Sequence, residues 1–358
     1  MEYILNSMMN VVVPPASMVM MAFAWPTLSF LRAAEWAVKT FFQEDMENKV
    51  VLITGASSAI GEQIAYEYAK RKANLVLVAR REHRLFGIRE NARILGARQV
   101  LVIAADVVKE DDCRRFVSDT ISYFGQLNHL VNTASLGHNF YFEDAVDTSI
   151  FPHLMDINFW GNVYPTYAAL PYLRQSHGRV VVNASIESWL PIPRMGLYAA
   201  AKAAVINFYD SLRYEVNDGV GITLATHGWI GGDMSRGKFM LEEGSEMQWR
   251  EEKEVSLTNG HVGEFARMMV AGACRGDTYV KYPTWYDTFL LYRVFVPDVL
   301  GWTFQLLLSS PGPRRHSLLP DASIAAGRPL LLEAPPVGKP ATTSPRRKPA
   351  TTSPRRAE

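Results

Sequence analysis

The chain has 358 residues, with 37 Lys and Arg against 36 Asp and Glu, and a formal net charge of +1. This near-neutral balance excludes the basic footprint of a nucleic-acid-binding protein. Cys113 and Cys274 lack metal-ligand spacing, so the sequence predicts no disulfide framework, no zinc or iron–sulfur centre and no other metal site. The length suffices for one large α/β domain with appended segments.

Residues 1–43 are predicted to form a lipid anchor. Residues 3–31 carry no charged side chain, and these 29 residues would extend beyond a hydrocarbon core of roughly 30 Å if they were helical. No Lys or Arg precedes the run, which argues for an uncleaved signal-anchor. Pro14, Pro15 and Pro26 interrupt it, so a transmembrane helix and a hairpin in one monolayer both remain open. The first positive charges follow the run, which predicts that the next domain faces the cytosol.

A strand, a tight turn and a helix are predicted from residue 50 to residue 71. The apolar run 50–53 is followed by Thr54-Gly55-Ala56-Ser57-Ser58-Ala59-Ile60-Gly61 and then by a helical pattern. Peptide N–H groups at a helix N-terminus bind phosphate, and glycine allows the backbone to approach it closely. The pattern therefore predicts a dinucleotide site that includes Gly55, Ser57, Ser58, Ile60 and Gly61.

The next predicted strand, residues 74–79, ends in Arg80 and Arg81. An NAD enzyme usually has an acidic residue here to bind the ribose 2′-hydroxyl, whereas a guanidinium suits a 2′-phosphate. The sequence therefore favours NADP(H) over NAD(H). A solvated surface pair is the alternative interpretation of these arginines.

Three polar residues further along the chain indicate proton and hydride chemistry. Ser185 ends the strand-like run 179–184, where it can hydrogen-bond a substrate oxygen. Tyr198 and Lys202 are four residues apart in a helical stretch and share one face. At about 4 Å their interaction would be worth roughly 4 kcal/mol, enough to lower the pKa of Tyr198 toward neutrality. This predicts Tyr198 to be the general acid and base.

With the glycine turn, Asn158 and the segment Asn132-Thr133-Ala134-Ser135, these residues resemble a short-chain dehydrogenase/reductase over residues 48–280. The resemblance implies an α/β fold with a doubly wound parallel sheet (Rossmann-type). It implies that Asp106 contacts adenine and that Asn132, Thr133 and Ala134 lie against the nucleotide. It further implies that Asn158 holds a relay water, that Lys202 binds the nicotinamide ribose, and that the protein forms a homodimer.

The proline-interrupted anchor and the segments 67–71, 156–161 and 169–176 resemble plant steroleosins, the hydroxysteroid-dehydrogenase-like proteins of oil bodies. This resemblance implies a lipid droplet or endoplasmic reticulum membrane as the location, and a sterol or steroid-like substrate. The expected function is NADP-dependent interconversion of a hydroxyl and a ketone.

Three departures from the family pattern support a different hypothesis. Ala59 replaces a glycine, Thr133 replaces an asparagine, and His227 replaces a proline. A non-catalytic lipid-droplet coat protein with a degenerate reductase fold is therefore the alternative.

Four regions are expected along the chain: the anchor 1–43, the dehydrogenase domain 44–282, an apolar segment 283–310 and a disordered basic tail 311–358. Residues 228–259 are expected to cover the substrate. The apolar segment could pack on a partner, rest on the droplet surface or form an ordinary buried helix. The tail contains the nonapeptide Lys-Pro-Ala-Thr-Thr-Ser-Pro-Arg-Arg twice, and its composition predicts disorder.

Overall fold

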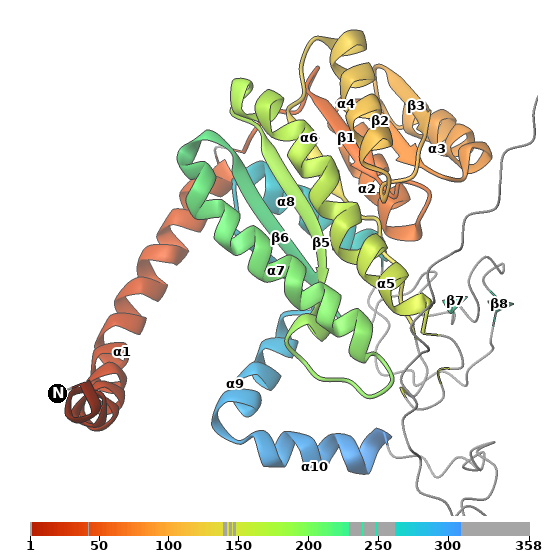
Figure 1. The fold of residues 1–358 in the computed structure, drawn as a ribbon. Helices are drawn as coiled ribbons and strands as arrows, with labels where there is room; N and C mark the ends of the chain where they lie inside the picture. The colour runs from red at the N-terminus through yellow and green to blue at the C-terminus, as the bar shows by residue number, and fades with distance from the viewer. Residues whose placement is uncertain are drawn as a thin grey trace, which may run out of the picture. The chain divides into compact units, whose positions relative to one another are not determined.

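The computed structural model describes residues 2–41, 43–138, 142, 145, 148–228, 238–239, 248–249 and 262–308. A parallel sheet forms the centre of the molecule, and its strands follow the order β3-β2-β1-β4-β5-β6-β9 (Figure 1). Their bounds are Val100–Ala104, Asn74–Ala79, Val50–Thr54, His129–Asn132, Arg179–Ser185, Gly221–His227 and Tyr279–Tyr282. This topology confirms the predicted doubly wound sheet.

Both faces of the sheet are covered by helices, which explains why its strands are apolar at successive positions. In β1, Val51 and Ile53 face one hydrophobic cluster and Val50 and Leu52 face the other. The first cluster includes side chains of α2 Ala59–Ala69, α3 Glu82–Ile94 and α8 Val262–Arg275. The second includes side chains of α4 Glu110–Phe124, α6 Gly161–Gln175 and α7 Gly196–Val216.

The strand register brings polar residues together at one edge of the sheet. Thr54 at the end of β1 is paired with Asn132 at the end of β4. Ser185 at the end of β5 is paired with His227 at the end of β6. Because parallel strands place their carboxyl ends at the same edge, this is where a doubly wound fold binds its ligand.

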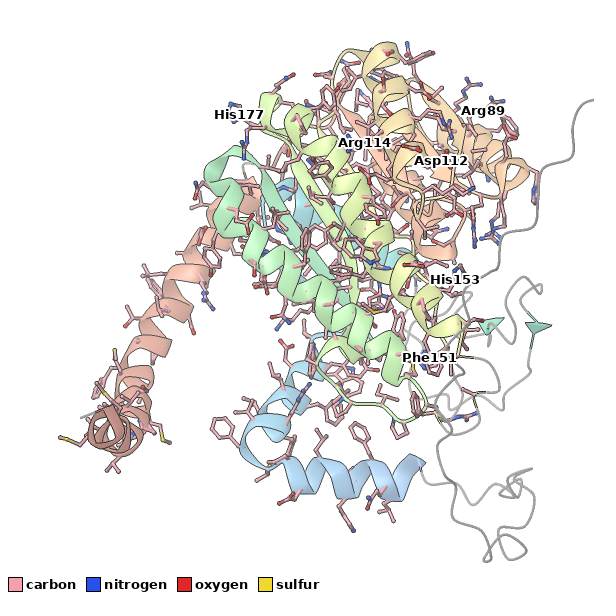
Figure 2. All side chains as sticks on the ribbon, viewed as in Figure 1. Arg89, Asp112, Arg114, Phe151, His153 and His177 are labelled. Carbon is pink, nitrogen blue, oxygen red and sulfur yellow. The ribbon has the colours of Figure 1, made fainter. Side chains whose placement is uncertain are left out.

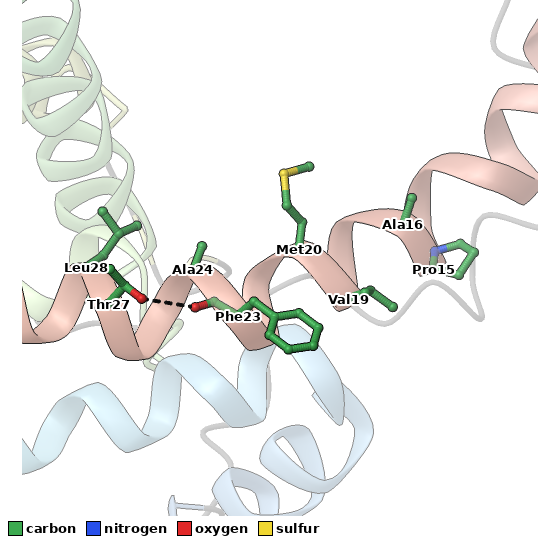
Figure 3. Close-up of a pocket in the computed structure, with 8 residues that line it drawn as sticks. All are labelled: Pro15, Ala16, Val19, Met20, Phe23, Ala24, Thr27 and Leu28. Carbon is green, nitrogen blue, oxygen red and sulfur yellow. Dashed lines mark hydrogen bonds between the residues drawn. The ribbon is translucent and has the colours of Figure 1, made fainter.

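The N-terminal segment forms the helix α1 Glu2–Phe41. No single described helix meets the length and hydropathy criteria for a membrane span, but Val11–Ala24 and Pro26–Phe41 meet them as a pair bent by 43°. Large apolar side chains along α1 are exposed, including Phe23 at 77% and Phe30 at 74%. Figure 3 shows its apolar hollow between Pro15 and Leu28.

After β9 the chain forms η5 Thr284–Tyr286, α9 Asp287–Phe295 and α10 Pro297–Leu308. Tyr286 and Leu300 form a small buried cluster with Ile186 and Leu190, which follow β5. No residue of α9 is buried, so the interpretation of this segment as an ordinary buried helix is wrong for α9. Its exposed apolar side chains, with those of α10, are Leu290, Leu291, Tyr292, Val294, Phe295, Val299, Trp302 and Leu306.

The remaining short elements are α5 Ile150–Met155, η2 Asp156–Trp160, η3 Ile186–Ser188, η4 Asn217–Gly219, β7 Lys238–Phe239 and β8 Gln248–Trp249. Most of the segment expected to cover the substrate, and the whole of the expected tail 311–358, lie outside the described residues.

Candidate active site

The predicted dinucleotide turn lies between β1 and α2 and is built around two glycines. Gly55 has a φ of +64°, and a Cβ there would lie 2.7 Å from the Ala134 nitrogen. A Cβ on Gly61 would collide with the Gly55 carbonyl oxygen. Ser58 caps α2 by accepting a hydrogen bond from the Gly61 nitrogen at 3.0 Å. The turn therefore requires glycine at both positions and directs the positive end of α2 toward the sheet edge.

Ala59, which replaces a family glycine, is the first residue of α2. Ala59 is not one of the described non-glycine residues that have a positive φ. The side chain at this position therefore carries no positive-φ penalty.

Arg81 lies against the glycine turn. Its Nε donates to the Ser57 hydroxyl at 3.2 Å and its Nη2 donates to the Ser57 carbonyl at 2.8 Å. Arg80 is exposed. A helix N-terminus beside a guanidinium is a donor set that fits a phosphate-bearing dinucleotide.

The side chain of Asp106 is part of its own loop, since it accepts from the Val108 nitrogen at 3.4 Å. This hydrogen bond does not test the predicted contact between Asp106 and adenine, which stays a prediction.

The segment after β4 is held by internal hydrogen bonds. Asn132 is buried, and its Nδ2 donates to the Asn162 carbonyl, Thr166 Oγ1 and Tyr209 Oη at 3.1, 2.9 and 3.1 Å. Thr133 Oγ1 donates to the Thr54 carbonyl at 2.6 Å. These side chains fix the loop against the sheet. The hydrogen bonds do not test the predicted contacts of Asn132, Thr133 and Ala134 with the nucleotide, which stay predictions.

Asn158 lies in η2, a π-helical turn between α5 and α6; such turns are frequent at functional sites. Its Oδ1 accepts from Ser135 Oγ at 2.9 Å and from the Leu136 nitrogen at 3.1 Å. Its Nδ2 donates to the carbonyls of Leu136 and Leu154 at 2.7 and 2.9 Å. The side chain thus joins the loop after β4 to the end of α5. A role in holding water stays a prediction.

Ser185, Tyr198 and Lys202 come together beside this loop. Tyr198 and Lys202 lie one turn apart on α7, and both side chains are fully buried. Lys202 Nζ is 5.7 Å from the centre of the Tyr198 ring and donates to the Asn183 carbonyl at 3.0 Å. Tyr198 is hydrogen-bonded to Ser135 and to Ser185. Ser135 therefore joins Tyr198 to Asn158, so Asn158, Tyr198 and Ser185 belong to one hydrogen-bonded group, with Lys202 beside the Tyr198 ring.

The electrostatics differ from the sequence-based expectation. Burial raises the pKa of Tyr198 well above its usual value, the charge of Glu187 raises it further, and the bonds with Ser135 and Ser185 only partly oppose this. Burial lowers the pKa of Lys202 to about 8, against the raising effect of Glu187. Burial and the charge of Glu187, and not Lys202, dominate the pKa of Tyr198, so the expected depression of this pKa by Lys202 is not seen.

Sequence reasoning missed the roles of Ser135 and Glu187. Ser135 stands where the family has glycine, so its hydroxyl was a visible departure with no assigned partner. Glu187 lies on η3, two residues after Ser185, is 4% exposed and accepts a hydrogen bond from the Ser185 hydroxyl. The available signal was a carboxylate two residues after Ser185 in the sequence.

His227 is a structural residue in this arrangement. It is buried, its Nδ1 lies 2.7 Å from the Gly228 carbonyl, and its ring packs edge-on against Phe265. Burial lowers its pKa to about 4, so it is neutral at physiological pH. No cluster of potential metal ligands occurs in the part of the chain that the structure describes.

Figure 2 shows the side chains on the ribbon, with Phe151 and His153 labelled on α5, just before η2, and Arg89 and Arg114 on the outer helices α3 and α4.

The sheet, the glycine turn and the buried Ser-Tyr-Lys group together define an oxidoreductase of the short-chain dehydrogenase type. The family described as short chain dehydrogenase matches residues 49–241, and the chain belongs to that family.

Plant relatives match almost the whole chain. The chain is 66% identical over 345 residues to "11-beta-hydroxysteroid dehydrogenase B" of Sesamum indicum, covering 96% of this chain and 91% of the relative. It is 64% identical over 349 residues to "11-beta-hydroxysteroid dehydrogenase-like 5" of Arabidopsis thaliana, covering 95% and 89%. These similarities confirm the resemblance to plant hydroxysteroid-dehydrogenase-like proteins.

Solved structures share the fold. A short chain dehydrogenase/reductase from Burkholderia phymatum in complex with NAD has a TM-score of 0.64 at 19% identity, covering 71% of this chain and 96% of that chain. An alcohol dehydrogenase from the archaeon Thermococcus sibiricus, complexed with 5-hydroxy-NADP, has a TM-score of 0.56 at 25% identity, covering 66% and 94%.

Proposed function

We propose that this protein is an NADP(H)-dependent oxidoreductase that interconverts a hydroxyl and a ketone on a steroid-like apolar molecule at a lipid droplet or endoplasmic reticulum membrane. The observation that carries the proposal is the convergence of Ser185, Tyr198 and Lys202 at the carboxyl edge of the sheet. The names of the plant relatives support the substrate class. The coat-protein alternative is not favoured, since Asn158, Ser185, Tyr198 and Lys202 are all present and buried and Ala59 does not have a positive φ.

The residues divide the chemistry among them. When bound, the nicotinamide supplies or removes hydride at the substrate carbon. Tyr198 gives a proton to the substrate oxygen or takes one from it, and Ser185 orients that oxygen by a hydrogen bond. Lys202 is held by the Asn183 carbonyl on the same helix face as Tyr198, where its ammonium can bind a ribose hydroxyl.

NADP(H) is proposed over NAD(H) because of Arg81. Its guanidinium is held on Ser57 beside the start of α2, and a 2′-phosphate bound there would receive charge-assisted hydrogen bonds. Arg81→Ala is expected to weaken NADPH binding about tenfold or more and to leave NADH binding nearly unchanged. Arg89→Ala on the exposed side of α3 is the matched control, since that arginine pairs with Glu90.

The lipid location is proposed from two apolar surfaces. The helix α1 exposes apolar side chains along its length, and α9 and α10 expose a second set. Water contact with so much apolar surface is unfavourable, so a lipid surface suits both. The catalytic domain is proposed to face the cytosol, as Arg32 and Lys39 follow the apolar run.

Turnover of a panel of hydroxysteroids, ketosteroids and sterols by the detergent-solubilised full chain tests the function. Tyr198→Phe is expected to lower kcat by about 100-fold or more, with NADPH affinity retained. Full activity in that variant would remove Tyr198 from the proton transfer. Absence of NADPH binding by the folded wild-type protein would instead support the coat-protein alternative.

A further inference from the structure

Four buried polar side chains form one hydrogen-bonded cluster that joins three elements of the domain. They are Asn132 on β4, Asn162 and Thr166 on α6, and Tyr209 on α7, and each is at most 1% exposed. Burying a polar group costs free energy unless it is hydrogen-bonded, and buried polar networks specify the geometry of a core. The cluster therefore fixes β4, α6 and α7 relative to one another.

Tyr209 lies on the same helix as two of the reacting groups. On α7 it follows Tyr198 by eleven residues and Lys202 by seven. These spacings are close to three and two helical turns, so the three side chains share one face of the helix. All three are fully buried. A shift or rotation of α7 at Tyr209 would therefore displace Tyr198 and Lys202 as well.

The hydroxyl of Tyr209 joins α7 to both other elements. Its Oη accepts from Asn132 Nδ2 at 3.1 Å, and its one proton is donated to the Asn162 carbonyl at 2.8 Å. The Thr166 hydroxyl lies 2.7 Å from this Oη and 2.8 Å from the same carbonyl, so its proton goes to one of these two oxygens. The phenol oxygen of Tyr209 is thus at the centre of the cluster.

Two further hydrogen bonds connect the cluster to the candidate active site. Asn162 Nδ2 donates to the Asn158 carbonyl at 2.8 Å, inside the π-helical turn η2. Asn132 Oδ1 accepts from Thr54 Oγ1 at 3.3 Å, and Thr54 directly precedes the glycine turn. Tyr209 is therefore linked through one residue to η2 and through another to the end of β1.

We propose that Tyr209 is a positioning residue for hydride transfer, whose hydroxyl holds α7, and with it Tyr198 and Lys202, in place against η2 and the end of β4. This inference rests on the proposed function. Hydride and proton transfer require the reacting atoms to be aligned in near contact, and a misplacement of about 1 Å can cost about 100-fold in rate. Tyr209 acts through Asn132 and Asn162, and not by contact with the substrate.

Tyr209→Phe removes the hydroxyl and leaves the ring in the core. The test is a single turnover of NADPH with a ketosteroid that the detergent-solubilised wild-type chain reduces. We expect the rate of hydride transfer to fall about tenfold. The Kd of NADPH and the KM of the steroid should stay within twofold of wild type, because the groups proposed to bind each ligand are unchanged. A rate within twofold of wild type would overturn the proposal, as would a loss confined to the affinity for NADPH.

Tyr68→Phe is the matched control. Tyr68 is a fully buried tyrosine on α2, and its hydroxyl lies 2.8 Å from Nδ1 of His129, at the opposite end of β4 from Asn132. This variant also loses a buried hydrogen bond, so urea unfolding should report a loss of stability for both variants. Its hydride-transfer rate should nevertheless stay within twofold of wild type. If both variants lose rate equally, Tyr209 only stabilises the domain and the positioning role is wrong.

Thr166 decides the question if Tyr209→Phe does not fold. Thr166→Val keeps the shape of the side chain and removes the hydroxyl that contacts Tyr209, whereas Thr166→Ser keeps that hydroxyl. We expect the valine variant to lower the hydride-transfer rate about fivefold with NADPH affinity retained, and the serine variant to stay within twofold of wild type. Equal rates in the two variants would overturn the proposal.

The two proposals can fail separately. A wild-type protein that turns over no hydroxysteroid or ketosteroid overturns the proposed function and this inference with it. A wild-type protein that is active, with a hydride-transfer rate that Tyr209→Phe leaves unchanged, overturns the inference alone.

Discussion

The carboxylate of Glu44 is expected to stabilise the domain strongly at neutral pH. It lies just after α1, accepts a hydrogen bond from His129 Nε2 at 3.1 Å and pairs with Lys49 Nζ at 2.5 Å. His129 Nδ1 in turn lies 2.8 Å from the Tyr68 hydroxyl. Burial acts to raise the pKa of Glu44, but the contacts with His129 and Lys49 outweigh it and lower the pKa to about 2. Burial lowers the pKa of His129 itself, so the neutral imidazole donates to Glu44 and accepts from Tyr68.

The magnitude follows from linkage. A fall from 4.5 to about 2 corresponds to about 3 kcal/mol at 1.36 kcal/mol per pKa unit. Because the folded-state pKa is the lower one, this stabilisation is fully present above the unfolded value and is lost as the pH falls from about 4.5 to about 2. Glu44→Gln should therefore lower the free energy of unfolding by up to about 3 kcal/mol at neutral pH.

Urea unfolding of the detergent-solubilised protein, followed across this pH range, measures the difference. Glu47→Gln is the matched control, because Glu47 pairs with Lys72 and Arg98 at the surface and should contribute at most about 1 kcal/mol. The reasoning is refuted if Glu44→Gln is as stable as wild type at neutral pH. It is also refuted if the difference persists undiminished below the unfolded-state pKa.

Three further outcomes are expected. Gly55→Ala should abolish nucleotide binding measured by fluorescence titration, because its Cβ would meet the Ala134 backbone at positive φ; unchanged affinity would contradict this. Asn132→Ala should destabilise the domain by about 2–3 kcal/mol in urea unfolding, since it leaves buried polar partners unsatisfied; a loss below about 0.5 kcal/mol would refute it. Cys113 and Cys274 should react slowly with a thiol reagent in the native protein and rapidly after unfolding, because burial raises their pKa values to about 12 and about 11; fast native labelling would count against their burial.

Local patterns were sufficient to predict the sheet and the residues at its carboxyl edge. The apolar run before Gly55 and the run before Ser185 are β1 and β5 of the structure. The four-residue spacing of Tyr198 and Lys202 predicted their shared helix face, and both lie on α7. Such patterns are readable because strand and helix periodicity acts over neighbouring residues.

The electrostatics of the site could not be predicted in the same way. Spacing alone indicated that Lys202 would lower the pKa of Tyr198, whereas complete burial and the charge of Glu187 raise it. Burial is a property of the whole packed domain. The use of Asn132 and Asn158 in fixing the β4 loop likewise depends on partners from other elements, which no local pattern identifies.

The small cluster of Tyr286, Leu300, Ile186 and Leu190 has a practical consequence. It joins the C-terminal helices directly to the turn that carries Ser185 and Glu187. A shortened chain that ends at β9 would lose this support along with the exposed apolar side chains of α9 and α10, and the η3 turn after Ser185 would no longer be packed. Removal of the N-terminal helix alone, with residues up to 308 retained, is therefore the truncation that should preserve turnover.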